Sequence, residues 1–91
     1  TTPLFVAAHK GQEKVVKVLL KAGVDPNIGA NDLSPLFVAC FFGYVHVVRS
    51  LLAFGAEKNS AAKADGATPI YIAAYQGHLP LVKILVTAGV E

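Results

Sequence analysis

Apolar and small residues recur along this chain in three blocks, each opened by a hydroxyl residue and a proline. The blocks are residues 2–8, 34–40 and 68–74. The spacings of 32 and 34 residues between their prolines are typical of stacked supersecondary units, in which no unit buries its apolar face alone. Glycines follow each proline by 8 and by 20 residues, at Gly11 and Gly23, Gly43 and Gly55, and Gly77 and Gly89. The pattern predicts a repeat protein.

The sequence of each repeat predicts two helices. Thr or Ser before proline favours a helix start, because the hydroxyl can accept a bond from an unpaired backbone N–H and proline has no N–H to leave unpaired. First helices are predicted over 3–10, 35–42 and 69–76, and second helices over 13–22, 45–54 and 79–88, each followed by a glycine. Residues 24–33 and 56–67, rich in Gly, Asn, Asp and Ala, predict turns.

The helix predicted over residues 13–22 is amphipathic. Its apolar stripe at i, i+3, i+4 and i+7 spacing consists of Val15, Val18, Leu19 and Ala22. The opposite side carries Lys14, Lys17 and Lys21. Because Lys17, Arg49 and Lys83 occupy equivalent positions, we expect a column of cations on a solvated outer face, with an anionic partner as the alternative.

The repeated residues resemble the ankyrin repeat. Each unit has Thr or Ser, Pro and Leu or Ile, then a small-residue pair and glycine, then a Val- and Leu-rich helix with its own glycine. Asp25 and Asn27, or Glu57 and Asn59, follow in the first two units. The resemblance implies one ankyrin-repeat domain over residues 1–91, with units of about 1–31, 32–64 and 65–91. The first unit lacks its leading hairpin and the last is truncated, which implies a segment of a longer array.

The fold implied by this resemblance is an all-α repeat solenoid of stacked helix pairs joined by hairpin-like loops. Phe5, Phe37 and Tyr71 stand where the family usually has a histidine that ties units together, so aromatic packing is expected instead. The first linker is shorter than usual, which argues against a regular hairpin over residues 29–33. Asn27 resembles the hairpin asparagine that asparaginyl hydroxylases modify in this family; alternatively, its side chain only ties down the turn.

The resemblance also implies a partner-binding groove. In ankyrin repeats the two positions after the small-residue pair, and the hairpin tips, tend to face it. Here these positions hold His9, Lys10, Phe41, Phe42, Tyr75 and Gln76, and the tips hold Asn31, Asp32, Leu33, Ala64, Asp65 and Ala67. Aromatic side chains are common anchors for protein partners. Alternatively, Phe41, Phe42 and Tyr44 only fill space between helices; Phe54 is expected to be packed.

Composition narrows the class of protein further. The 91 residues are 54% hydrophobic and 15% charged, so much of the surface must be covered. The longest apolar run, 36–42, is far shorter than the roughly 20 residues that span a bilayer, so no membrane insertion is expected. A net charge of +2 is too small and scattered to favour nucleic acid. A lone Cys40 favours a reducing intracellular setting, the cytoplasm with the nucleus left open, over a processed secreted fragment.

The titratable residues form no catalytic pattern. His9, His46 and His78 occupy non-equivalent positions without the helical spacing of a metal clamp. Cys40 fills a small-residue slot, which indicates an inert buried thiol rather than a nucleophile. The glycines are spaced as helix stops and not as a phosphate-binding loop. We therefore expect no enzyme activity, metal or cofactor.

Two classes of function remain. The leading hypothesis is a non-catalytic module that binds a protein or peptide through its concave groove. The alternative is a structural spacer that stacks end to end with neighbouring units or with itself; a designed repeat protein is a further alternative, against which the uneven linkers argue. Solvent-exposed Phe41 and Phe42 would favour recognition, whereas buried rings with bare apolar ends would favour stacking.

Overall fold

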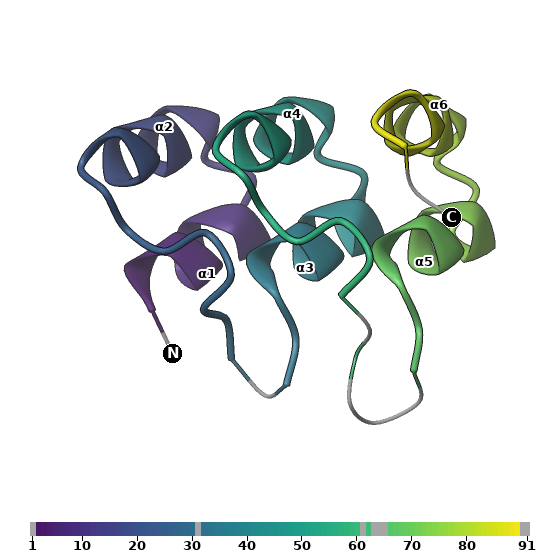
Figure 1. Cartoon of the computed structure of the whole chain (residues 1–91), viewed down its shortest axis with the longest axis horizontal. Helices are drawn as coiled ribbons and strands as arrows, with labels where there is room; N and C mark the ends of the chain where they lie inside the picture. Colours follow the sequence, from purple (N-terminus) through teal and green to yellow (C-terminus); the bar gives the residue numbers. More distant parts are fainter. Residues whose placement is uncertain (1, 31, 61, 63–65, 90–91) are drawn as a thin grey trace.

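The chain folds into helix pairs that stack side by side. The computed structural model describes residues 2–30, 32–60, 62 and 66–89. Within them lie α1 (Pro3–His9), α2 (Glu13–Lys21), α3 (Pro35–Phe42), α4 (Val45–Ala53), α5 (Pro69–Tyr75) and α6 (Leu79–Thr87). Figure 1 shows α1, α3 and α5 in one layer and α2, α4 and α6 in a second, with the linkers reaching away from the second layer. The predicted solenoid of helix pairs is confirmed.

The first helix of each pair starts at the predicted hydroxyl. The side-chain oxygens of Thr2, Ser34 and Thr68 accept hydrogen bonds from the backbone N–H three residues later, at 3.1, 3.0 and 3.3 Å. A cap of this kind contributes about 1 kcal/mol to stability. Every helix except α3 ends one residue earlier than predicted, because the last predicted residue acts as the C-cap before glycine.

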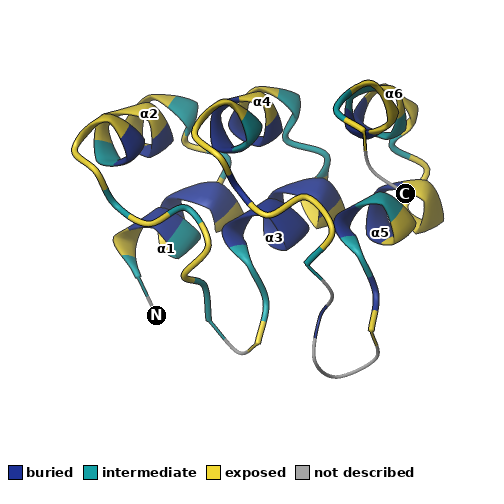
Figure 2. Cartoon of the chain, viewed as in Figure 1, coloured by how far each residue is buried: buried dark blue, intermediate teal, exposed yellow. Residues whose placement is uncertain are grey.

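Small residues form the contact between neighbouring first helices. Ala7, Ala8, Ala39, Cys40 and Ala73 are buried, so α1 and α3, and α3 and α5, pack closely. Leucines and valines of both layers complete one continuous core. Figure 2 shows the buried residues on the helix sides that face other helices.

The apolar stripe predicted on α2 is wrong in part. Val16 and Leu20 supply its buried side. Val15 is 45% exposed, whereas its equivalents Val47 and Leu81 are 1% and 0% exposed because a preceding helix pair covers them. The other exposed members of the stripe are Val18 and Ala22. The valines of α2 therefore lie on two sides of the helix, with Val16 facing the core and Val15 exposed.

The first linker is closed by an isolated β-bridge between Ala30 and Leu33. The N–H of Ala30 donates to the carbonyl oxygen of Leu33 at 3.1 Å, and the N–H of Leu33 donates to that of Ala30 at 2.9 Å. A Cβ on Gly29 would lie 1.7 Å from the Leu33 carbonyl oxygen. A short linker can therefore close here because residue 29 has no side chain.

Side chains in the linkers join consecutive helix pairs. The Oδ1 of Asn27 accepts from the backbone N–H of Glu57 at 2.7 Å, and the N–H of Asn27 donates to the Asp25 carboxylate at 2.9 Å. Lys58 Nζ donates to the carbonyl oxygen of Ala88 at 2.5 Å. The Asp25 side chain thus ties down the turn through the Asn27 N–H, whereas the Asn27 side chain bonds to the next repeat, which differs from the expectation that it only ties down its own turn.

Candidate partner-binding site

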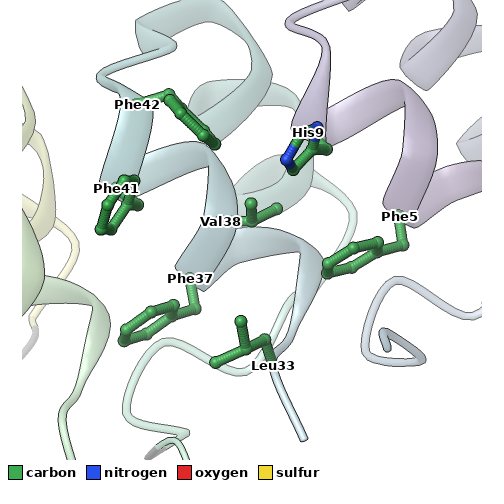
Figure 3. A pocket seen from close by; sticks show the side chains of 7 residues that line it. All are labelled: Phe5, His9, Leu33, Phe37, Val38, Phe41 and Phe42. Atoms are coloured by element: carbon green, nitrogen blue, oxygen red, sulfur yellow. The ribbon is translucent and has the colours of Figure 1, made fainter. Parts of the chain in front are cut away.

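An apolar hollow lies between α1 and α3, on the side of the first linker. It has a volume of about 330 Å³ and is lined by Phe5, His9, Leu33, Phe37, Val38, Phe41 and Phe42 (Figure 3). The first helix of one pair supplies one wall, and that of the next pair supplies the other. The hollow therefore exists only because the two pairs stack in register.

The two exposed phenylalanines of α3 are held in place by other rings. Phe41 and Phe42 are 39% and 42% exposed. Their ring centroids lie 5.0 Å apart, edge to face, and Phe42 makes a second edge-to-face contact with His9 at 5.1 Å. Tyr44 stacks on Phe42 at 5.7 Å. Such contacts contribute about 0.5–1.5 kcal/mol each beyond burial, so the rings are ordered although water reaches them.

The hollow unites only some of the predicted partner-binding residues. His9, Leu33, Phe41 and Phe42 line it together. Lys10, Asp32, Tyr75 and Gln76 are exposed but do not line it. Tyr75 instead stacks on Tyr71 at 6.1 Å, one helix further along. Asn31, Ala64 and Asp65 lie outside the described residues.

Sequence reasoning missed three lining residues, Phe5, Phe37 and Val38. The signal was present, because Phe5 and Phe37 occupy the position at which the family usually has histidine, and aromatic packing was expected there. Phe37 is buried and Phe5 is half-buried, in accord with that expectation, whereas Tyr71 is exposed. The two phenylalanines line the hollow together with the exposed rings and are not only a contact between repeats (Figure 3).

The lone cysteine is buried and electrostatically unsuited to nucleophilic chemistry. Cys40 is free and fully buried in α3. Burial disfavours the thiolate and raises the pKa of the Cys40 thiol to about 12. The expected inert thiol in a small-residue slot agrees with this environment.

The remaining polar groups offer little chemistry. No group of three His, Cys, Asp or Glu side chains among the described residues could hold a metal ion. Across that same part of the chain, none of the helices has the length and apolar character needed to cross a bilayer. His78 lies at the start of α6, where its Nε2 is 3.0 Å from the Phe41 carbonyl oxygen.

Comparisons with known proteins agree with this geometry. A family model described as ankyrin repeats in three copies matches residues 4–91. The chain therefore belongs to the ankyrin repeat family, whose members generally act as protein-interaction modules. The predicted resemblance is confirmed.

Similarity to a solved structure also supports the ankyrin repeat fold. The crystal structure of the human ASB11 ankyrin repeat domain is similar to this chain with 34% sequence identity and a TM-score of 0.92. The similarity covers 100% of this chain and 41% of that one, so this chain spans less than half of that domain. No curated protein has significant sequence similarity to the chain.

Proposed function

We propose that the chain is a non-catalytic recognition module that binds a protein or peptide through the hollow between α1 and α3. The observation that carries the proposal is the exposure of Phe41 and Phe42 beside an apolar volume of about 330 Å³. Ordered aromatic rings bury a large area on binding and lose little conformational freedom. The volume of the hollow suits one or two apolar side chains of a partner. Lys10 and Asp32, on the adjoining helix end and turn, would supply polar contacts at the rim.

The test begins by selecting a peptide ligand without assuming its sequence. Peptides are selected from a random displayed library on the immobilised chain, and the dissociation constant of the best one is measured for variants. Phe41→Ala and Phe42→Ala should each weaken binding about thirtyfold, as expected when a central anchor loses about 2 kcal/mol.

Phe54→Ala is the matched control. Phe54 is also 42% exposed, but it follows α4 in the other layer. The prediction that it is packed is therefore wrong. Equal losses of affinity for Phe42→Ala and Phe54→Ala, with folding intact, would refute the assignment of the hollow. The lysine variant Lys83→Ala, which removes an exposed charge on α6, should change affinity by less than about fivefold.

A structural role is the second candidate, and the two ends of the stack favour it. Val6, Val15 and Val18 are exposed at one end, and Tyr71 and Val86 at the other, while most of their equivalents in the central pair are buried. A second copy or further repeats would cover these surfaces. Sedimentation over a wide concentration range tests self-stacking: mass that rises with concentration and falls in a Val15→Lys variant supports it, and a constant monomer mass argues against it.

We also propose an intracellular, cytoplasmic location and a scaffolding role. The support is chemical: a lone buried thiol suits a reducing compartment. Microscopy of the tagged parent protein would test this, and secretion of that protein would contradict it.

A further inference from the structure

A second groove runs between α2 and α4 in the outer layer, and cations dominate it. The groove has a volume of about 350 Å³ and is lined by Glu13, Lys17, Lys21, His46, Arg49, Ser50, Ala53 and Phe54. Lys17, Lys21 and Arg49 are all exposed. The helices of this layer carry Lys14 and Lys83 as well, against Glu13 as their single acid.

The cations of this outer groove form no ion pair with a carboxylate among the described residues. Glu13 Oε2 lies 3.8 Å from His46 Nδ1, at the end where α2 and α4 begin. Lys17, Lys21 and Arg49 take part in no ion pair within the described ranges. Three cations without an ion pair, set against one carboxylate, Glu13, around one concave surface would attract a carboxylate-bearing partner and gain by pairing with it.

We propose that the outer groove binds an extended acidic peptide segment whose acidic residues alternate with neutral ones. Lys17 and Lys21 are one helical turn apart, a rise of about 6 Å. Alternate side chains of an extended peptide point to the same side and repeat about every 6.6 Å. Two carboxylates at i and i+2 would therefore meet Lys17 and Lys21, and Arg49 on α4 would approach the pair from the other wall.

The length of the groove limits the segment. Residues 13 to 21 of α2 rise about 12 Å, enough for about four extended residues. Glu13 occupies one end and would repel an acidic residue there. The preferred segment consequently has its acidic pair towards Lys21 and a neutral residue beside Glu13.

Glu13 and the concave shape of the outer groove also select against other polyanions. A nucleic acid carries a phosphate at every nucleotide and could not avoid Glu13, whereas a peptide can place a neutral residue beside it. A bilayer surface is flat and would leave the floor around Ser50 and Ala53 without contact. The acidic peptide is the occupant that satisfies both features.

The test uses three fluorescein-labelled peptides in 20 mM salt. The first contains Gly-Glu-Ala-Glu-Gly, the second Gly-Glu-Glu-Ala-Gly, and the third Gly-Gln-Ala-Gln-Gly. Fluorescence anisotropy should show the first binding about threefold or more tightly than the second, which has the same charge but the wrong spacing. The third should not bind, and affinity for the first should fall as salt rises.

Variants then locate the site. A double variant Lys17→Ala and Arg49→Ala should weaken binding of the first peptide by about tenfold, in keeping with two partly exposed charge pairs. Lys14→Ala is the control, because it removes a charge from α2 at a residue that does not line the groove. It should change affinity less than twofold, with unchanged thermal melts for all variants.

Three results would overturn the proposal. One is that the first peptide does not bind more tightly than the second, whether both bind equally or neither binds. Another is a loss in Lys14→Ala as large as that in the double variant, which would indicate only a general charge effect. The third is tighter binding of a 12-base single-stranded DNA or of phosphatidylserine vesicles with the same dependence on Lys17 and Arg49, which would assign the groove to another class of partner.

Discussion

The imidazole of His78 packs directly on the backbone of Gly43, so closely that a Cβ on residue 43 would lie 2.8 Å from the ring. The same contact occurs one pair earlier, where a Cβ on residue 11 would lie 2.9 Å from the ring of Tyr44. Gly43 and Gly11 each follow a first helix with positive φ. The residue that opens a second helix thus packs on the glycine of the preceding pair.

Gly43→Ala should destabilise the chain more than Gly77→Ala. Both glycines have similar positive φ values, 80° and 75°, so both variants pay about 1–2 kcal/mol of backbone strain. Only at Gly43 must the new methyl group also displace His78, which adds about 1–3 kcal/mol of overpacking, because nothing lies within 4 Å of a Cβ on Gly77. Chemical denaturation of both variants measures the difference; equal midpoints would mean that His78 does not pack as described.

Ala39→Leu should be far more damaging than Ala74→Leu. Ala39 is fully buried between first helices, whereas Ala74 is exposed on α5. Overpacking at Ala39 should cost about 1–3 kcal/mol, and the same change at Ala74 should stay within about 0.5 kcal/mol. Thermal melts decide between them. His9→Leu, an exposed change on α1, should also be mild, and a large loss there with a stable Ala39→Leu variant would show the repeat register to be wrong.

Cys40 predicts a stability loss at alkaline pH. The pKa of its thiol is raised from 9.0 to about 12 in the folded chain. Between these values the unfolded chain releases the proton and the folded chain keeps it, so the free energy of unfolding falls by about 1.4 kcal/mol per pH unit. The contribution is complete below pH 9 and is lost as pH rises. From pH 8 to pH 10 the parent should therefore lose more free energy of unfolding than the Cys40→Ala variant. A difference in free energy of unfolding that stays constant over this range would contradict the burial of the thiol.

Asn27→Ala should loosen the contact between the first two helix pairs. The variant leaves the N–H of Glu57 without the acceptor it has at 2.7 Å, and the site is exposed, so a cost of about 0.5–1.5 kcal/mol is expected. Hydrogen exchange of the Glu57 amide should accelerate. Asn27→Asp keeps an acceptor oxygen and should preserve protection of that amide; if both variants exchange alike, the hydrogen bond is not responsible.

The repeat was predictable because its signals are local. The hydroxyl caps at Thr2 and Ser34, and the glycine stops, each act within one turn of helix and can be identified in the sequence. The buried face of α2 was not predicted correctly, because Val15 and Val16 are equally apolar and only the neighbouring helix pairs decide which is covered. The lining of the hollow was predicted only in part for the same reason. The positions of Phe41 and Phe42 in the repeat indicate that they face the groove, but their juxtaposition with Phe5 depends on how two helix pairs stack.

The most direct test of the recognition account is an amide chemical-shift titration of the ¹⁵N-labelled chain with its selected peptide. We predict that the largest changes fall on Leu33, Phe37, Phe41 and Phe42, around the hollow between α1 and α3. Changes concentrated instead at the ends of the stack, on Val15 and Val18 or on Tyr71 and Val86, would contradict this assignment and favour stacking.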